Sequence, residues 1–547
     1  MNWQSPLRVS CSQPWIYLVL GILGLALPAL GAVPLTGEIV DAATQKPVAA
    51  RIYIQNDVGK WFFPVSQAAD GSAIRYEKQN WANKNAVEMH TTLSAHPFRV
   101  ELEPGNYTFT VERGKEYLPL TQRVTVGNEP IQIKLALARW VDMAARGWFS
   151  GDTHNHRDPR ELLNVMLAED LNVALPMVYW TTSDSVPPSK SPQNFKGKFD
   201  AELTRVDDSH VIWPRNTEYE IFTTAKKQHT LGALLAVNHR TVFDLPALPV
   251  TKIAALARSE GALLDLEKHN WPWSLALVPL VKPDLFELAN NHHWATEFSV
   301  RNWAESAPAW MKIGTGGNTE REWTLFGFQT YYALLNSGFR ISPAAGTANG
   351  VHPVPLGFGR VYVHTGKRFD YDEWIRGLKA GRSFVTTGPM LLVTINNDLP
   401  GKQFSSKRGK PVKLAIKGAV VSERPVSEVE IVVNGDVVKT VALKPKQTKS
   451  GAYEAAVSSD WTCDGSSWIA LRCFEPRDGE RFRFAHTAPW WVEVADKPLR
   501  PKKQEIDWFI SSVRKELERS KSLLSPEAIR DYEAALAAYE HLAITAQ

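Results

Sequence analysis

The spacing of apolar residues changes character several times along the 547 residues of this chain. From residue 35 to about 137, and again from about 391 to 494, short apolar runs broken by turn residues are typical of β-sandwiches, the first of them antiparallel. Between these two stretches, strand-like and helix-like segments alternate, which favours a β/α barrel. Residues 506–542 have the spacing of two helices broken at Ser525-Pro526. We therefore expect a multidomain protein, which the chain length also favours.

The N-terminus has the features of an export signal. Its apolar run, Ile16 to Leu27, is too short to span a bilayer core of about 30 Å, and small residues at Ala29 and Gly31 suit signal peptidase. We expect an exported protein, periplasmic or extracellular, with no integral membrane span after cleavage; an uncleaved anchor is the alternative. The predicted segments are a signal peptide at 1–31, a β-sandwich at 32–138, a barrel at 139–390, a second β-sandwich at 391–497 and a helical tail at 498–547.

Charge and cysteine content limit the possible partners. The 62 basic and 58 acidic residues are spread along the chain and give a formal charge of +4. Without a basic stripe that could release many phosphate counterions, nucleic acid is a poor candidate, and a small-molecule or cell-surface substrate is expected. After Cys11 only Cys463 and Cys473 remain, and they either pair in an oxidising compartment or stay free and buried. These patterns leave the oligomeric state open.

The strongest chemical signal is the segment Gly151-Asp152-Thr153-His154-Asn155-His156. Side chains two residues apart point to one face of a strand, so both imidazoles can bind one metal ion. A strand is expected at residues 148–152. A helix should follow, with Asp158 as its cap, Pro159 in its first position and Glu161 completing a capping box.

Further metal-ligating side chains follow this pair in the same segment. Glu218 and Glu220 lie on one face of a strand-like stretch and either complete a metal site or face solvent. His269 ends a later strand candidate, and we expect it to point toward the same end of the barrel as His154 and His156. The predicted metal ligands are His154, His156, Glu218, Glu220, His229, His269, His292 and His293.

Five motifs mark residues 145–390, namely Gly151–His156, Leu167–Val173, Glu287–His292, Pro355–Val363 and Ala380–Pro389. Together they resemble the CehA/McbA family of metallohydrolases within the PHP (polymerase and histidinol phosphatase) superfamily. The resemblance implies a distorted (β/α)₇ barrel that binds up to three divalent ions, commonly zinc, manganese or iron. It assigns His154 and His156 to the first motif, Glu218 or Glu220 to a metal-bridging glutamate, and His229 and His269 to two later histidines.

The first β-rich segment has motifs of its own, in Thr36–Ala42, Lys46–Arg51 and Leu102–Tyr107. These motifs resemble the transthyretin-like carboxypeptidase regulatory domain, and the resemblance covers about 100 residues of the chain. It implies a β-sandwich for residues 32–138.

Two ligand-bearing motifs of the PHP superfamily are missing. Residues 178–181 read Val-Tyr-Trp-Thr where Thr-Asp-His is usual, and residues 346–350 read Gly-Thr-Ala-Asn-Gly where Asp-x-His is usual. We therefore expect one or two divalent ions (Zn²⁺, Mn²⁺ or Fe²⁺).

The expected function is hydrolysis of an ester, carbamate, amide or phosphoester by metal-activated water, with Glu218, Glu220 and Arg382 as catalytic residues. Arg360 is a second candidate contact for an oxyanion or phosphate. The first alternative is a non-catalytic glycan- or ligand-binding protein built on a depleted barrel. The second is a glycan-active enzyme that uses two carboxylates and no metal.

Overall fold

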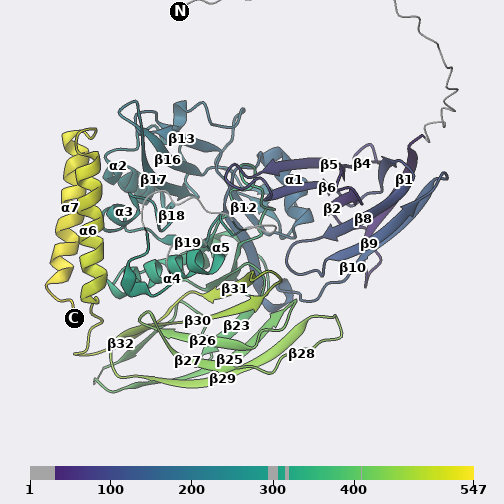
Figure 1. The fold of residues 1–547 in the computed structure, drawn as a ribbon. Coiled ribbons are helices and arrows are strands. Elements are labelled where there is room, and N and C mark those ends of the chain that lie inside the picture. The colour runs from purple at the N-terminus through teal and green to yellow at the C-terminus, as the bar shows by residue number, and fades with distance from the viewer. Residues whose placement is uncertain (1–30, 294–297, 299–305, 315–318, 408) are drawn as a thin grey trace, which may run out of the picture.

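The computed structural model describes residues 31–293, 298, 306–314, 319–407 and 409–547. The predicted signal peptide lies outside these residues, apart from Gly31. Three strand-rich regions follow one another along the chain, and a helical hairpin closes it (Figure 1). Within the described ranges, no helix has both the length and the apolar character needed to cross a bilayer.

The N-terminal region consists of two sheets around one apolar core. The first has the order β10-β1-β7-β4, and the second has the order β5-β6-β2-β8-β9 with β3 on the edge of β2. Side chains from both sheets, among them Leu35, Ile52 and Phe98, are buried together. β1 and β10 pair in parallel, so the prediction of a wholly antiparallel sandwich is wrong at this pair. The strands are β1 (Val33–Asp41), β2 (Ala50–Asn56), β3 (Trp61–Phe62), β4 (Val65–Ser66), β5 (Ala73–Gln79), β6 (Val87–Leu93), β7 (Phe98–Leu102), β8 (Gly105–Glu112), β9 (Leu120–Val126) and β10 (Ile131–Leu137).

In the middle region the predicted alternation of strands and helices holds only in part, because β12 to β17 follow one another without an α-helix and β17 pairs antiparallel with β16 and β18. Its strands are β11 (Trp148–Asn155), β12 (Val173–Pro176), β13 (Tyr179–Ser183), β14 (Thr204–Arg205), β15 (Val211–Ile212), β16 (Thr217–Thr224), β17 (Lys227–Val237), β18 (Leu263–Leu266), β19 (Leu285–Ala289), β20 (Ser342–Ala345), β21 (Arg360–His364) and β22 (Ser383–Thr386). Its helices are α1 (Pro159–Ala168), α2 (Val250–Glu260), α3 (Ser274–Val281), α4 (Glu320–Asn336) and α5 (Tyr371–Ala380), with short 3₁₀ turns at Ala144–Arg146, Pro188–Lys190 and Ala309–Met311.

The strands of the middle region belong to two different sheets. One is six-stranded, with the order β13-β16-β17-β18-β19-β20, and the other strands join a 12-stranded sheet in the order β14-β15-β12-β11-β21-β22. The two sheets meet where β11 lies beside β20, and there the Thr153 hydroxyl donates to the Ala345 carbonyl at 3.1 Å. This contact brings the end of β11 close to the ends of β18 and β19.

The 12-stranded sheet continues into the C-terminal β-region, because β22 pairs with β31. A second, four-stranded sheet with the order β23-β25-β29-β28 packs against this continuation. The predicted Asn434-Gly435 hairpin is confirmed: it joins β26 to β27, and both residues have positive φ, as a tight hairpin turn requires. Cys463 and Cys473 are free and buried. The strands are β23 (Met390–Ile395), β24 (Gln403–Ser406), β25 (Val412–Ser422), β26 (Glu428–Val433), β27 (Asp436–Ala442), β28 (Lys446–Gln447), β29 (Tyr453–Cys463), β30 (Ser467–Pro476), β31 (Phe482–Thr487) and β32 (Trp490–Val494).

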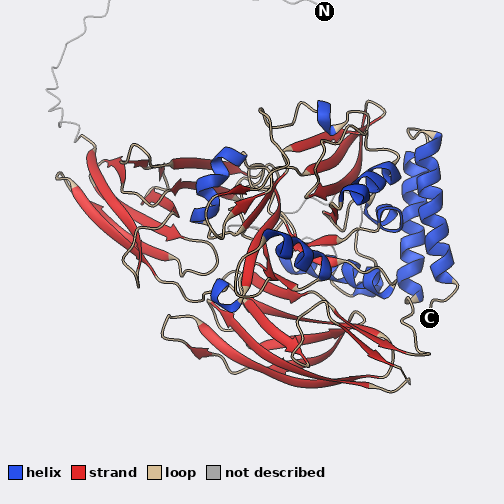
Figure 2. Ribbon diagram, turned by 180° about the vertical axis from the view of Figure 1, so that it is seen from behind, coloured by secondary structure: helices blue, strands red, loops and turns tan. Residues whose placement is uncertain are grey.

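The predicted helical tail is a pair of helices, α6 (Lys503–Ser520) and α7 (Pro526–Ala543). Ser525 caps α7 by accepting from the Ala528 amide, and Pro526 occupies the first turn, as the sequence indicates. The pair stands at the edge opposite the N-terminal sheets (Figure 2). It packs against α3, where the Tyr539 hydroxyl donates to the Leu275 carbonyl at 2.7 Å, and it shares the core of the middle region.

Candidate metal centre

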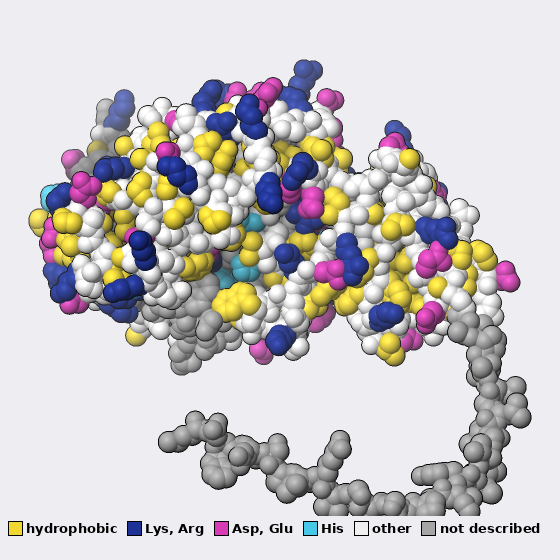
Figure 3. Space-filling model, turned by 90° about the horizontal axis from the view of Figure 1, so that it is seen from above, with side chains coloured by type: hydrophobic (Ala, Val, Ile, Leu, Met, Phe, Trp, Pro, Cys, Tyr) yellow, Lys and Arg dark blue, Asp and Glu magenta, His cyan; other side chains and the backbone are white. Residues whose placement is uncertain are grey.

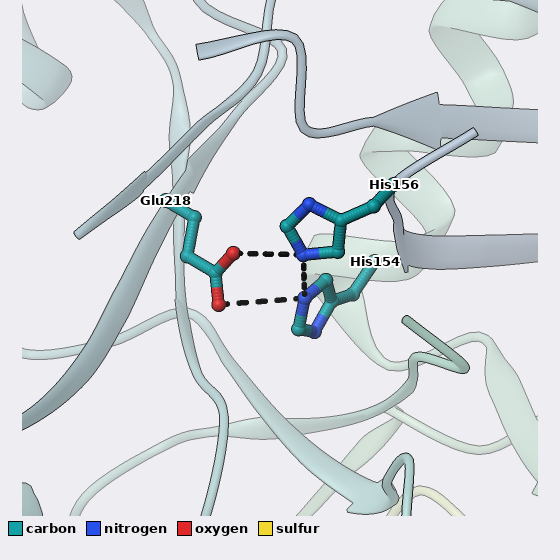
Figure 4. A group of neighbouring side chains, drawn as sticks. All are labelled: His154, His156 and Glu218. Atoms are coloured by element: carbon teal, nitrogen blue, oxygen red, sulfur yellow. Dashed lines mark hydrogen bonds and ion pairs between the residues drawn. The ribbon is translucent and has the colours of Figure 1, made fainter. Parts of the chain in front are cut away.

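The histidine pair lies at the end of β11, as the sequence predicts. His154 is within the strand, and His156 follows it directly. The His156 amide donates to the Asn349 carbonyl at 2.6 Å, which holds the backbone extended past the end of the strand. Both side chains therefore point to one side, and their Nε2 atoms lie 3.2 Å apart (Figure 4). The alternating geometry of a strand is thus enough to bring the two imidazoles together.

Glu218, near the start of β16, completes a group of three ligand atoms. One carboxylate oxygen lies 3.4 Å from His154 Nε2 and the other lies 2.9 Å from His156 Nε2. We call His154, His156 and Glu218 the ligand group (Figure 4). Atoms that bind a tetrahedral zinc ion at about 2.0–2.1 Å lie roughly 3.3 Å from one another. The spacing in the ligand group is close to that value.

Glu287 on β19 fixes the orientation of His154. Its Oε1 lies 2.9 Å from His154 Nδ1, which leaves Nε2 directed at Glu218 and His156. A carboxylate behind a histidine is the usual way to orient a metal-binding imidazole. Burial opposes charge on His154, but Glu287 and Glu218 outweigh burial and raise the imidazole pKa well above its ordinary value. A Cβ at Gly346 would collide with His154 and Glu287, so glycine lets this loop approach them.

A second set of charged side chains lies next to the ligand group. Glu267 follows β18, and its carboxylate, with those of Glu218 and Glu220, forms a cluster whose ligand atoms are within 4.8 Å of one another. The Lys268 ammonium pairs with Glu267 and lies 4.9 Å from the centre of the Trp271 ring. Burial, together with the charges of Glu218 and Glu267, raises the Glu220 pKa well above its ordinary value. The protonated form of Glu220 is therefore favoured relative to an ordinary glutamate.

Several buried polar atoms beside the ligand group lack partners. Among the described residues, no hydrogen bond reaches Asp265 Oδ1, Glu267 Oε2 or Glu287 Oε2. Leaving such atoms unpaired in a protein interior costs on the order of 1–3 kcal/mol each, and more when the group is charged. Burial raises the pKa of Glu287 to about 7, against the influence of His154. This end of the sheet therefore holds more carboxyl groups than cations, and a bound cation would stabilise their ionised forms.

The three later histidines lie near the ligand group but outside it. His269 is buried between Trp323 and Phe326, with ring centres at 4.3 and 4.6 Å, and neither of its nitrogens has a partner among the described residues. Burial, with smaller effects of His293 and Lys268, lowers its pKa to about 3, so the ring is neutral. His293 is close enough to hydrogen-bond with Thr324 at 3.0 Å, and its pKa falls to about 4, mainly through burial.

His292 lies with its ring centre 4.7 Å from that of Trp323 and 6.4 Å from that of His352. Of the predicted ligands that follow Glu220, His292 thus lies beside His352. The His156 side chain is only 7% exposed, so the ligand group is largely buried by the described residues. Seen from above, histidine side chains reach the surface near the middle of this face (Figure 3).

The structure does not bring His229 to the centre. It lies near the turn end of the β16–β17 hairpin, 2.8 Å from the Ser520 hydroxyl of α6 and 3.3 Å from Arg519. β17 is 11 residues long, and its first residues, which include His229, extend to α6. His229 therefore belongs to the contact with the helical hairpin.

Neither predicted arginine lies in the centre. Arg382 precedes β22, and its backbone carbonyl accepts from the His364 amide. His364 pairs with Trp148, which is at the opposite end of β11 from His154. Its guanidinium pairs with the half-exposed Glu373 at 3.1 Å. Arg360 is fully buried and donates to the carbonyls of Gly357, Glu169 and Asp170. Its role is to hold loops.

The sequence prediction missed four side chains of the centre: Asp265, Glu267, Lys268 and Glu287. Asp265 and Glu267 are two residues apart, as are His154 and His156, so strand alternation was a signal available in the sequence. Glu287 lies inside one of the recognised motifs. Which strands face one another decides these contacts, and the sequence pattern does not contain that information.

Comparison with known proteins gives little. No family model and no curated protein matches the chain. Among solved structures, a group B streptococcus pilus 2b backbone protein aligns with 20% of this chain and 41% of its own length, at 16% identity and a TM-score of 0.14. The chain thus spans less than half of that protein.

Proposed function

We propose that the middle region is a metal-dependent hydrolase whose ion is held by His154 Nε2, His156 Nε2 and Glu218. The observation that carries the proposal is the convergence of these three ligand atoms at spacings of 2.9–3.4 Å. We further propose that the two sheets of the middle region form the distorted barrel of the PHP superfamily. The motifs between residues 145 and 390, and the position of the site at the end of β11, support this.

The donor set suits a borderline divalent ion. Two imidazoles and one carboxylate are the protein ligands of many catalytic zinc sites, which keep a fourth position for water or substrate. When bound, such an ion lowers the pKa of water toward about 7 and polarises a carbonyl or phosphoryl oxygen. The second group of carboxylates would hold another ion less well, because Lys268 already pairs with Glu267. One tightly held ion is therefore expected.

Three side chains around the ion would have separate roles in the reaction. Glu287 keeps a proton on His154 Nδ1, which leaves Nε2 free to donate its lone pair. Lys268 places a positive charge beside the carboxylates and is available to stabilise negative charge on a reacting oxygen. Glu220, whose pKa is raised well above its ordinary value mainly by burial, is suited to give a proton to a leaving group. These roles fit an ester, carbamate, amide or phosphoester.

A non-catalytic ligand-binding protein is the second candidate, favoured by the aromatic rings around the centre. The Trp180 ring centre lies 4.5 Å from that of His156, and Trp323 packs on His269. Aromatic faces with a few polar groups are typical of small-molecule sites. A binding protein would keep the metal but turn over no substrate.

The test measures metal content and substrate turnover on the same purified protein. We would purify the protein without a metal-affinity tag, measure its metals by elemental analysis, and assay activated esters, carbamates, amides and phosphoesters. About one equivalent of divalent metal and chelator-sensitive hydrolysis are expected. The double variant His154→Ala/His156→Ala should lose both, whereas His541→Ala on α7 should lose neither. Metal retained by the double variant would refute the ligand assignment, and metal without turnover would favour the binding protein.

We also propose that the protein acts outside the cytoplasm, on the strength of the apolar run and small residues before Ala32. N-terminal sequencing of material recovered from the periplasm or medium should begin near Ala32. A cytoplasmic product that retains Met1 would contradict this.

A further inference from the structure

A polar pocket of about 140 Å³ lies where the three strand-rich regions meet, away from the ligand group. Lys115, in the connection between β8 and β9, comes from the N-terminal region. Phe358 comes from the loop before β21, and Arg477 and Arg483 come from the C-terminal region. A cavity needs only about 10–15 Å³ to hold one water molecule, so this one has room for a small polyatomic ligand.

The positive charges of this pocket are not all neutralised by the protein. Arg477 is paired with Glu423 at 2.9 Å and with Glu475 at 2.5 Å. Lys115 forms no ion pair among the described residues, although Glu112 and Glu423 also line the pocket. Its ammonium lies 3.7 Å from the centre of the Phe358 ring. The Arg483 guanidinium lies 4.7 Å from the centre of the same ring.

Two cations thus share one aromatic ring. The ring face attracts the Lys115 ammonium by only about 0.5–2 kcal/mol, which is less than a charged partner would supply. Burial and the neighbouring arginines Arg483, Arg360 and Arg477 hold the Lys115 pKa well below its ordinary value. Burial also lowers the Arg483 pKa, to about 10. The Nε of Arg477 is buried and has no hydrogen-bond partner among the described residues.

We propose that this pocket binds a small oxyanion, a phosphate or sulfate group, between Lys115 and Arg483. An oxyanion would supply the negative charge that Lys115 lacks and would accept hydrogen bonds from both cations. The volume of the pocket suits a tetrahedral group, either as a free ion or as the end of a larger molecule. The site is independent of the proposed hydrolase activity.

The pocket also lies close to a support of the ligand group. Phe358 follows Gly357, whose amide donates to the Asp152 carboxylate at 3.0 Å, and the same carboxylate accepts from the His154 amide at 3.1 Å. A ligand between Lys115 and Arg483 would therefore contact the loop that positions His154. This places the oxyanion at a junction of regions, connected to the candidate metal centre through the Gly357 loop and Asp152.

The experiment measures thermal unfolding and calorimetric binding of the full-length protein with inorganic phosphate or sulfate, against chloride at equal ionic strength. Phosphate and sulfate should raise the melting temperature, with one binding event per chain. Glycerol 3-phosphate serves as a second arm. If it binds as well as phosphate, the pocket takes the end of a larger phosphorylated ligand, and if only the inorganic ions bind, it takes the free oxyanion.

Lys115→Met is the decisive variant, because methionine keeps the contact with Phe358 and removes the charge. Its phosphate affinity should fall by about tenfold or more, as the loss of a charge-assisted hydrogen bond predicts. Its melting temperature in chloride should match or exceed that of the wild type, because an unpaired cation has been removed.

Lys60→Met is the matched control, since the exposed Lys60 lies 5.1 Å from the centre of the Phe62 ring in the same region. This variant should bind phosphate as the wild type does. Equal stabilisation of Lys115→Met and wild type by phosphate would overturn the proposal. The absence of any phosphate or sulfate effect on the wild type, or a Lys115→Met protein less stable in chloride, would also overturn it.

Discussion

Two clusters of buried charge in this molecule differ in how they are neutralised. The first, which we call the interface network, joins the N-terminal sandwich to the end of α1, where Arg51 pairs with Glu169 and Glu112, and Arg113 pairs with Asp170 at 2.8 Å. There the carboxylates face arginines. In the candidate metal centre the carboxylates outnumber the protein cations, and three of the buried oxygens have no partner among the described residues.

The difference separates a structural role from a binding role. Breaking a buried ion pair costs more than the pair contributes, so a fully paired network fixes how two regions meet. A cluster left with unpaired carboxylates is unfavourable by itself and persists where a ligand completes it. Removing a charge should therefore harm stability in the interface network and ligand binding in the centre. The predictions below test this contrast.

The largest effect is expected for Arg51→Met. The change leaves Glu169 buried without its cation, which should lower the free energy of unfolding by about 3–5 kcal/mol. Denaturant unfolding measures this loss, while metal content per folded molecule should stay unchanged. Arg75→Met is the control, because Arg75 forms an exposed pair with Glu77 in the same region. If Arg51→Met lowered the free energy of unfolding no more than Arg75→Met does, the proposed contrast between the two clusters would be wrong.

A smaller effect, in binding, is expected for Glu287→Gln. The variant keeps an oxygen near His154 Nδ1 but loses the charge, and such changes behind a metal-binding histidine weaken affinity by about 10–100-fold. Competition with a chromogenic chelator measures the change. Glu505→Gln, another buried carboxyl, which accepts from Asn336, is the control and should leave affinity unaltered. Unchanged affinity in Glu287→Gln would argue against His154 as a ligand.

Glu88, which lies beside the interface network and accepts from the Tyr53 hydroxyl, should make stability depend on pH. Burial, partly offset by Arg51 and Tyr53, raises the Glu88 pKa to about 7. Because the pKa in the folded state is raised, the contribution of Glu88 to stability is fully present below about pH 4.5 and is lost as pH rises to about 7. Glu88→Gln should flatten this decline, which we expect to be about 3 kcal/mol. Parallel slopes in the variant and the wild type would contradict the assignment.

The smallest effect is expected for Arg382→Ala. Arg382 is partly exposed, pairs with Glu373 and lies at the far end of the sheet from His154. Exposed pairs of this kind contribute about 0–1 kcal/mol, so hydrolysis should change by less than about twofold. Steady-state rates on the best substrate provide the measurement. A loss of tenfold or more would bring Arg382 back into the catalytic machinery.

The parts of the fold that could be predicted from the sequence depend on local rules. The apolar run Leu285–Ala289 predicts a strand by itself, and β19 has these bounds. Asp158 caps α1 as expected, but Glu161 pairs with Arg157 at 2.7 Å and does not serve the predicted capping box. β5 was missed because it reads Ala-Ile-Arg-Tyr-Glu-Lys-Gln and is mostly exposed.

The parts that could not be predicted depend on which strands become neighbours. His154 and His156 follow from spacing alone, whereas Glu287 reaches His154 only because β20, the partner of β19, lies beside β11. His229 shows the converse. It has a suitable side chain at a plausible distance along the chain, but the extent of the β16–β17 hairpin places it against α6. Residue type and spacing limit the candidates, and only the tertiary arrangement selects among them.

The continuous sheet has a consequence for how this chain can be divided. β22 of the middle region pairs with β31 through residues 384–386, so a cut near residue 390 would separate two hydrogen-bonded strands. Both would become bare edges, and exposed edges invite pairing with other chains. A fragment ending at residue 390 should therefore aggregate, whereas one beginning near residue 139 and retaining the C-terminal strands keeps its edges covered. The smallest autonomous unit of this protein runs across the boundary that its sequence suggests.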